Sequence, residues 1–258
     1  MKTEFQLSSI ERQEKILNLL KNKNRVTVPE VCRLFSISKA TARRDLNVLV
    51  NNGKTTRVRG GAVLLEKSAP ELPMLIREAE LRGEKQRIGK ATAELINEGD
   101  TIFLGSGTTV LEVARNLTEK RNLTVLTNSL PIINLLVENK GINLIVFGGE
   151  LRSSELSFIG HITEKALNEV RADIVIMGAR AISLREGITN DFLAETLTDR
   201  AIIRIGKKVI LVADYTKFGK ISTAFLAPLE KISTIVTNKE ISQEYIENLI
   251  EDIEVILT

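Results

Sequence analysis

The chain has 258 residues, of which 43% are hydrophobic, so it is long enough for two domains with ordinary cores. Its net charge of +3 hides an asymmetry: residues 1–66 hold 13 Lys and Arg against 6 Asp and Glu, whereas the remainder holds 23 against 27. A basic first part followed by a slightly acidic second part indicates that only the first part meets a polyanion such as nucleic acid.

Composition also excludes several kinds of protein. Cys32 is the single cysteine, which excludes an intramolecular disulfide and a multi-cysteine zinc site, and we expect it to be a buried, unreactive thiol. No apolar run reaches about 18 residues, so the sequence predicts no membrane span. The first residues are polar and lack a signal-peptide core, so we expect a cytoplasmic protein, and we assign no metal or cofactor.

Two short helices are predicted near the start of the chain. Ser8 and Glu11 have the spacing of a capping box, in which each residue satisfies a free backbone N–H of the other. Thr27 and Glu30 repeat this spacing ahead of a helix over about 28–35. The apolar faces of these helices are expected to contribute to a small core.

The stretch 38–51 is predicted to form a third helix with two distinct faces. Ser38 is a good N-cap, and Ala42, Leu46 and Leu49 recur at helical spacing on one side. The opposite side presents guanidinium and amide groups. One face is therefore suited to packing, and the other is suited to a polar partner.

A basic hairpin is predicted directly after this helix. Gly53 is expected to end the helix, and two short β-rich runs flank Gly60 and Gly61. Arg57 and Arg59 then lie near the tip of the hairpin. A helix with outward arginines followed by a basic hairpin is typical of a winged helix-turn-helix, with the helix-turn-helix at about 25–44.

The mode of DNA binding follows from the shape of the grooves. A helix fits the major groove, and its N-terminal residues reach the base edges, so Arg43 or Arg44 is expected to read bases, with phosphate contacts as the alternative. Arg57 and Arg59 are expected to hold phosphates or to enter a minor groove. Asp45 is expected to orient these two arginines or to bond within the domain rather than to touch DNA. The candidate DNA-binding residues are Ser38, Lys39, Ala40, Thr41, Arg43, Arg44, Arg57 and Arg59.

This stretch also resembles a known family. RRDLNVL, then Gly53, then RVRGGA is similar to the signature of DeoR-type bacterial transcription regulators. Arg59 stands where that family usually has histidine, which keeps a hydrogen-bond donor and adds a permanent charge. The resemblance implies a DNA-binding domain, which we place at residues 8–65.

The rest of the chain is predicted to be a linker and an α/β domain. Residues 66–83 carry two prolines and dense charge, so we expect a linker there, with a short helix at about 74–81. From residue 84 to 258, apolar strands alternate with helices, which predicts a mainly parallel sheet with helices on both faces. The expected strands are 101–104, 123–127, 143–147, 174–177, 209–213, 234–237 and 254–257, and the expected helices are 84–97, 110–117, 131–139, 162–170, 192–205 and 243–250.

One loop of this domain has the features of a phosphate site. Gly105 to Thr109 lies between a strand and a helix, where glycines allow a close approach of the backbone and the helix start offers free N–H groups. Ser106, Thr108 and Thr109 add hydroxyl donors. No lysine follows the second glycine, so the loop is not a Walker loop.

Small or polar loops follow the other strands, and the carboxyl ends of parallel strands meet at one crevice. Arg152 and Lys217 are cations that would neutralise a bound anion, with an ordinary surface role as the alternative for each. The candidate effector-binding residues are Gly105, Ser106, Gly107, Thr108, Thr109, Asn128, Ser129, Gly148, Gly149, Arg152 and Lys217.

The order of these loops strengthens the resemblance. GSGTT, TNS, GGELR and DYTKFGK look like the effector domain of DeoR-type regulators, which is similar in fold to ribose-5-phosphate isomerase and glucosamine-6-phosphate deaminase. The resemblance implies that residues 105–109 hold the phosphate of a phosphorylated sugar and that Lys217 faces the same pocket. It thus implies a winged helix-turn-helix followed by an α/β sugar-phosphate domain.

The leading hypothesis is a DNA-binding regulator, a repressor of carbohydrate genes whose affinity for its double-stranded operator is controlled by a phosphorylated sugar. We also expect a homo-oligomer, because paired half-sites need paired heads. We assign no catalytic residue and no enzymatic activity.

Two alternatives stay open at this point. One is a sugar-phosphate isomerase or deaminase fused to a DNA-binding head, which would need a base close to the carbon acid. His161 is the single imidazole, and we expect it at a helix start as a capping or surface residue. The other is a nucleic-acid-binding scaffold whose second domain only oligomerises. The carboxylates in suitable loops are Glu150, Glu155, Asp191, Glu195 and Asp214.

Overall fold

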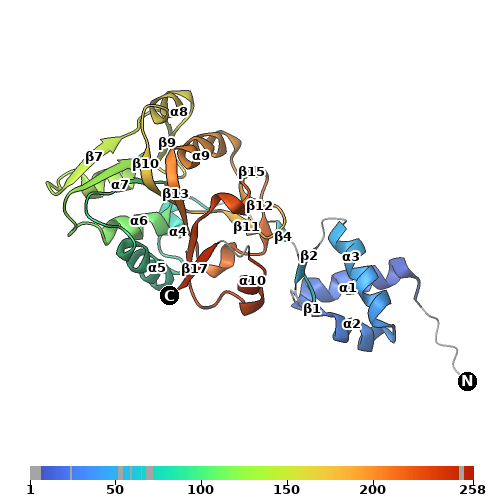
Figure 1. The fold of residues 1–258 in the computed structure, drawn as a ribbon. Helices are drawn as coiled ribbons and strands as arrows, with labels where there is room; N and C mark the ends of the chain where they lie inside the picture. Colours follow the sequence, from blue (N-terminus) through green and yellow to red (C-terminus); the bar gives the residue numbers. More distant parts are fainter. Residues whose placement is uncertain are drawn as a thin grey trace, which may run out of the picture. The chain divides into compact units, whose positions relative to one another are not determined.

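The computed structural model describes residues 7–23, 25–51, 55–58, 60–64, 66–67, 72–249 and 253–258. Its internal contacts divide the chain into two compact units, the first holding Met1–Lys67 with Gln243–Asn248 and the second holding Ser68–Ser242 with Leu249–Thr258 (Figure 1). Within these described ranges no helix is both long enough and apolar enough to cross a membrane.

The first unit is a small helical domain with a β-hairpin. Strands β1, β3 and β2 form an antiparallel sheet in that order, and β2 pairs with β3 on either side of Gly60. The predicted helices and hairpin are confirmed, whereas Gly53 and Arg59 lie outside the described residues. The elements before Ser68 are α1 (Ser9–Lys23), β1 (Arg25–Thr27), α2 (Val28–Phe35), α3 (Lys39–Asn51), β2 (Thr55–Val58), β3 (Gly61–Leu64) and β4 (Glu66–Lys67).

Side-chain caps fix where these helices begin. Both predicted capping boxes form: the backbone N–H of Ser8 donates to Glu11, and that of Thr27 donates to Glu30 at 2.8 Å. The hydroxyl of Ser38 accepts from the backbone of the residue at the third position of α3 at 3.1 Å. These local bonds satisfy N–H groups that the helices leave free, which explains why the starts were readable from sequence.

The core of the first unit is built from the apolar faces of the three helices and from β1 and β3. Cys32 packs against this core but is partly exposed, so its predicted full burial is wrong. The buried members are Ile16, Leu20, Val26, Val28, Val31, Ala42, Leu46, Leu49 and Ala62.

The second unit is organised on a seven-stranded parallel sheet of order β17-β16-β13-β10-β5-β6-β7. The predicted parallel α/β fold is confirmed, and the ends of the strands and helices predicted from residue 84 onward match or shift by at most three residues. The strands are β5 (Thr101–Leu104), β6 (Leu123–Thr127), β7 (Ile142–Val146), β10 (Ala172–Met177), β13 (Gly206–Val212), β16 (Thr234–Thr237) and β17 (Glu254–Leu257).

Helices cover both faces of this sheet (Figure 1). Helices α5, α6 and α7 share one apolar cluster with alternate residues of the central strands, such as Ile102 and Leu104. Helix α9 contacts β10 and β13 and contributes nothing to that cluster, so it lies on the other face. The helices of the second unit are α4 (Met74–Arg77), α5 (Arg82–Glu94), α6 (Thr108–Arg115), α7 (Leu130–Leu136), α8 (His161–Leu167) and α9 (Leu193–Ile205), with 3-10 turns η1 (Tyr215–Lys217) and η2 (Leu229–Lys231). Helix α10 (Gln243–Glu247) falls in the first unit.

Two features of the second unit differ from the sequence prediction. Small antiparallel pieces, the β8–β9 hairpin and the β11-β12-β15 sheet, fill stretches that carried no predicted strand. The predicted linker 66–83 is not free over its second half, because Met74 and Arg77 are buried within the second unit. The remaining strands are β8 (Glu150–Arg152), β9 (Ser157–Ile159), β11 (Ala181–Ser183), β12 (Gly187–Asn190), β14 (Lys220–Ile221) and β15 (Ala224–Ala227).

The strand order places a binding crevice. From β5 the chain continues outward to β6 and β7, then returns to the other side of β5 to form β10 and β13. Strands β5 and β10 therefore flank the topological switch point, and the loops at their carboxyl ends leave a crevice between them. The loop 105–109 follows β5, and residues 178–180 follow β10.

Candidate functional site

Helix α3 presents a polar surface on the first unit. Lys39, Ala40, Arg43 and Arg44 are exposed, whereas Ala42 on the packing side is fully buried. The cap at the start of α3 fixes this end of the helix, so the basic side chains are displayed along its first two turns. This matches the geometry by which a recognition helix enters a major groove.

Other contacts hold α3 in place. Asp45 is 2% exposed and accepts hydrogen bonds from Arg12 at 2.6 Å and from Gln13 at 3.2 Å, so the prediction that it bonds within the domain is confirmed. Arg57 on β2 is exposed and donates to Asn47 on α3. The wing and the helix are thereby linked on the side that carries the basic groups.

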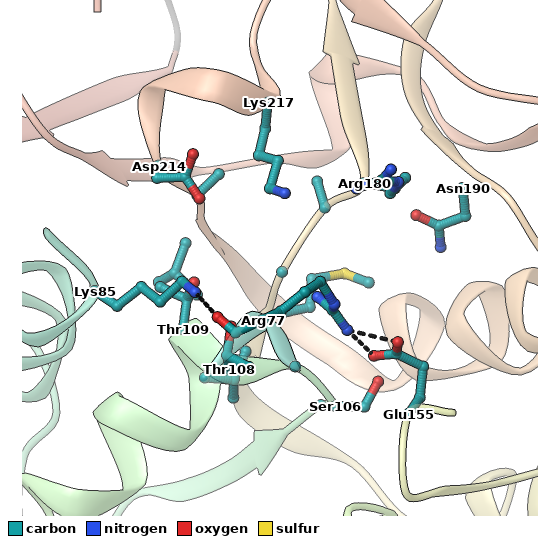
Figure 2. Close-up of a pocket in the computed structure, with 18 of the residues that line it drawn as sticks. Arg77, Lys85, Ser106, Thr108, Thr109, Glu155, Arg180, Asn190, Asp214 and Lys217 are labelled. Carbon is teal, nitrogen blue, oxygen red and sulfur yellow. Dashed lines mark hydrogen bonds and ion pairs between the residues drawn. The ribbon is translucent and has the colours of Figure 1, made fainter. Parts of the chain in front are cut away.

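A pocket opens in the second unit at the switch point of the sheet (Figure 2). Its floor is the loop from Gly105 to Thr109, which connects β5 to α6, and residues 178–180 after β10 form the neighbouring wall. Gly107 precedes α6 with φ of 112°, a conformation that favours glycine, and the first free N–H groups of the helix follow it. Thr108 and Thr109 are buried beside these N–H groups.

Two lysines point into this pocket from different elements (Figure 2). Lys217 comes from the turn η1 after β13, as predicted. Lys85 comes from α5, is 5% exposed, and donates to the backbone oxygen of Arg77 at 2.5 Å. Burial lowers the pKa of Lys85, and the neighbouring Asp214 opposes that shift. Free N–H groups, hydroxyls and two ammonium groups around one space suit a phosphate group.

The other wall of the pocket carries carboxylates that are engaged by partners, of which Glu155 and Glu195 are buried. Both Glu155 oxygens lie 2.5 Å from the guanidinium of Arg77, and Glu195 pairs with Arg152. Asp199 accepts from Asn190 at 2.8 Å. Burial, reinforced by the charge of Glu195, raises the pKa of Asp199 well above its ordinary value.

The predicted effector residues divide into two groups. Gly105, Ser106, Gly107, Thr108, Thr109 and Lys217 are brought together as pocket lining. Asn128, Ser129, Gly148, Gly149 and Arg152 are not part of that lining. The first four follow β6 and β7, which lie away from the switch point, with β7 at the edge of the sheet, and Arg152 lies on β8.

The second group makes structural contacts outside the pocket lining. Asn128 donates through its side chain to Phe158 at 2.8 Å and accepts from the same residue's backbone at 2.8 Å, which holds the β8–β9 hairpin against the sheet. A Cβ on Gly149 would lie 2.2 Å from the hydroxyl of Thr163, so glycine permits close packing there. Arg152 lies 4.7 Å over the ring of Phe192 and pairs with a carboxylate of the pocket wall.

Sequence reasoning missed several residues of the pocket. Arg77 fell in the predicted linker, and Lys85 was one charge among many in an amphipathic helix. Residues 178–180, in contrast, were expected at the crevice as a loop that follows a strand, and Arg180 lines the pocket and pairs with Asp191 at 2.8 Å. A buried lysine in a helix has no local signal, because its burial depends on contacts made far along the chain. His161 begins α8 and is exposed, in agreement with its predicted surface position.

Comparisons with known proteins cover both units. The family model of the DeoR-like helix-turn-helix domain matches residues 12–68, and that of the DeoR C terminal sensor domain matches residues 81–239. Among solved structures, ribose 5 phosphate isomerase A from Neisseria gonorrhoeae aligns with 52% of this chain and 52% of its own at 18% identity and a TM-score of 0.39.

Curated relatives match along most of their length. The chain is 36% identical over 232 residues to the transcriptional repressor AccR of Agrobacterium fabrum, which covers 90% of each protein. It is 35% identical to the HTH-type transcriptional regulator IolR of Bacillus subtilis, over 85% of this chain and 87% of the relative. It is 33% identical to the glycerol-3-phosphate regulon repressor of Escherichia coli, over 90% and 92%.

A winged helix-turn-helix followed in one chain by an α/β domain with a pocket suited to anions is typical of DNA-binding regulators that respond to a ligand. Within that class, this chain belongs to the DeoR family of transcription regulators. The resemblance noted from the motifs is confirmed over both parts of the chain.

Proposed function

We propose that this protein is a transcriptional repressor of carbohydrate-metabolism genes that releases its operator DNA when a phosphorylated sugar binds to the second unit. Relatives named as repressors, including those of a glycerol-3-phosphate regulon and of a lactose phosphotransferase system, support repression and a link to phosphorylated carbohydrates. These relatives are named as regulators, which favours regulation over the isomerase or deaminase alternative.

The observation that carries the sugar-phosphate proposal is the composition of the pocket. The loop 105–109 offers backbone and hydroxyl donors at the start of α6, and Lys85 and Lys217 supply positive charge beside it. Carboxylates and amides on the opposite wall are suited to sugar hydroxyls. A sugar phosphate with its phosphate at the loop and its hydroxyl groups toward Asn190 would contact both the floor and the opposite wall of the pocket.

The proposed roles of the candidate residues follow from their positions. Residues 105–109 and Lys217 would touch the effector, whereas Asn128, Ser129, Gly148, Gly149 and Arg152 would hold the elements that carry the pocket wall. On the first unit, Lys39, Ala40, Thr41, Arg43 and Arg44 would face the major groove, with Ser38 fixing the helix start. Arg57 and Arg59 would bind phosphates or a minor groove.

We also propose self-association, since two linked heads reading paired half-sites bind far more tightly than one. A regulator of this kind acts on the bacterial chromosome, so its proposed location is the cytoplasm.

The experiment is a thermal-shift screen of the full chain against sugar phosphates and the matching free sugars. A ligand that binds the folded state raises the melting temperature by mass action, by an amount that grows with its concentration. We expect a rise with one phosphosugar and none with its free sugar. No rise across the panel would contradict the sugar-phosphate assignment, while equal rises with both forms would contradict the phosphate loop.

The same screen supplies the ligand for a second measurement. A DNA duplex selected by the protein from a random pool is titrated with the protein, with and without the phosphosugar that raised the melting temperature. We expect the phosphosugar to weaken DNA binding. Tighter binding would identify the phosphosugar as a co-repressor and would contradict release of the operator.

A further inference from the structure

Helix α4 is a single turn that depends on contacts with the rest of the second unit. Isolated helices shorter than about 12 residues are marginal in water, so four residues need external support. The backbone N–H of Met74 donates to Ser154 at 2.8 Å, and the guanidinium of Arg77 pairs with Glu155 at 2.5 Å. The backbone oxygen of Arg77 accepts from Lys85 at 2.5 Å. Two of these three contacts involve residues of the effector pocket.

Lys85 is an unusual member of this set. It is a buried ammonium group with three donors, and the acceptor it reaches among the described residues is a neutral backbone oxygen rather than a carboxylate. It points into the pocket beside Thr109, where the proposed phosphate would lie (Figure 2). Lys85 is therefore a buried cation that bonds a neutral acceptor and lies next to a loop suited to anions. Its ammonium group is in place to bind an anion such as phosphate.

We propose that the effector and helix α4 compete for the ammonium group of Lys85, so that a phosphate group bound at residues 105–109 releases the carboxyl end of α4. A phosphoryl oxygen carries negative charge and attracts the ammonium group by a charge–charge interaction that the neutral backbone oxygen of Arg77 lacks, so a bound phosphate draws Lys85 away from Arg77. This inference rests on the proposed function, because it requires the phosphate to bind at that loop.

The backbone between Arg77 and Lys85 is suited to such a release. Leu81 joins α4 to α5, lines the pocket, and has φ of 47°, in the left-handed region that non-glycine residues avoid. Such a conformation persists only while surrounding contacts hold it. Loss of the Lys85 contact removes a constraint on Arg77, at the end of α4 that leads to Leu81.

The release of α4 would couple phosphate binding in the pocket to the DNA-binding unit through the chain that connects them. Helix α4 is the first helix of the second unit after the winged domain in sequence. A change in how α4 is anchored therefore changes the attachment of the segment that leads from one unit to the other. Coupling of this kind needs a ligand with different affinities for the two states, and competition for Lys85 supplies that difference.

Hydrogen exchange of the full chain, titrated with inorganic phosphate at constant ionic strength, tests the proposal. We expect phosphate to slow exchange in peptides covering residues 105–111. We expect it to speed exchange in peptides covering residues 74–81 by at least about tenfold, because the amide of Glu78 is protected by its bond to Met74 within α4. Sodium chloride at equal ionic strength is the control.

The two peptides separate failure of this proposal from failure of the proposed function. Slowed exchange at residues 105–111 with unchanged exchange at residues 74–81 leaves the phosphate site intact and overturns the competition. Unchanged exchange at residues 105–111, up to the highest phosphate concentration at which the chain stays folded, overturns both.

Substitutions at residue 85 provide an independent check. In Lys85→Met, α4 loses its clamp without any ligand, so exchange at residues 74–81 is expected to be fast and insensitive to phosphate. In Lys90→Met, an exposed lysine of the same helix, exchange is expected to match the parent chain. Wild-type protection of residues 74–81 in Lys85→Met would overturn the proposal.

Discussion

The buried pair between Arg12 and Asp45 shows how single residues hold the reading helix in place. Asp45 lies on α3 between the packing and polar faces, and its carboxylate accepts hydrogen bonds from two side chains of α1. The side chains are 11% and 3% exposed, so the two charges are largely removed from water. Removing one of them leaves the other buried without a partner, which costs more than the pair contributes.

Asp45→Ala is therefore expected to destabilise the first unit by about 3 kcal/mol. Urea unfolding followed by circular dichroism measures the change. Glu14→Ala, which removes an exposed carboxylate of α1, is the matched control and is expected to stay within about 0.5 kcal/mol of the parent chain. If the free energy of unfolding falls no more than in the control, Arg12 is solvated or paired in another way once Asp45 is removed.

Asp199 shows how burial sets the protonation of a pocket residue. Its raised pKa means that the folded state binds more protons than the unfolded state, from about the ordinary value of 3.8 up to the folded pKa. Stability contributed by the neutral acid is therefore lost as the pH rises through that window. Above the folded pKa the charge stays buried and the loss is complete.

Asp199→Asn cannot ionise, and its amide oxygen still accepts from Asn190. Relative to the parent chain, its stability is expected to increase with pH across the window, by up to about 1.4 kcal/mol for each pH unit. Thermal unfolding between pH 4 and pH 8 measures the difference, with Glu169→Gln as an exposed control. A difference that does not change with pH would mean that Asp199 is ionised throughout.

At the scale of elements, the packing of α5 on α6 determines where two sides of the pocket lie. Helix α5 supplies Lys85, and the N-terminus of α6 carries the phosphate loop. Gly89 permits their close approach, because a Cβ there would lie 2.6 Å from the backbone carbon of Glu112. Neither backbone segment yields easily, since Glu112 lies inside a helix.

Gly89→Ala is expected to push the two helices apart and to lower the free energy of unfolding by about 1–3 kcal/mol. Gly83→Ala in the same helix is the control: its new methyl group has only Arg87 within 4 Å, at 3.8 Å, so it is expected to stabilise by about 0.5 kcal/mol. Chemical denaturation compares the two variants. Equal effects would mean that the helix contact adjusts without cost.

At the scale of the whole molecule, the two units carry different chemistry. The exposed basic face of α3 lies in one unit, and the pocket with its paired charges lies in the other. Because no residue belongs to both sites, a substitution that removes one ligand contact without changing how α4 is anchored should change one binding constant and leave the other intact. Because the two sites share no residue, a ligand bound in the pocket changes the affinity for DNA by changing the conformation of the protein.

Arg44→Ala is expected to weaken binding to the selected duplex by about 10- to 100-fold and to leave phosphosugar affinity unchanged. Thr108→Val keeps the side-chain shape and removes one hydroxyl, so it is expected to weaken phosphosugar binding about tenfold with unchanged DNA affinity. Fluorescence anisotropy and calorimetry measure the two constants. Loss of both in either variant would contradict the independence of the sites.

The sequence alone determined the features that depend on neighbours along the chain. The caps at Ser8, Thr27 and Ser38 bind N–H groups three residues ahead, and the alternation of strands and helices reflects local periodicity. The loop 105–109 was also readable, because its glycines, hydroxyls and following helix are contiguous. These are short-range effects, so their signals lie within a few residues of each other.

Only the tertiary structure decided which of the polar loops form the pocket. The order of the strands places the loops after β5, β10 and β13 together and leaves those after β6 and β7 aside, and strand order is a matter of long-range pairing. Arg77 meets Glu155 across 78 positions of sequence, and Lys85 lines the same pocket as Asp214 and Lys217, which lie far along the chain. Burial and ion pairing arise from contacts between distant segments, which no local pattern encodes.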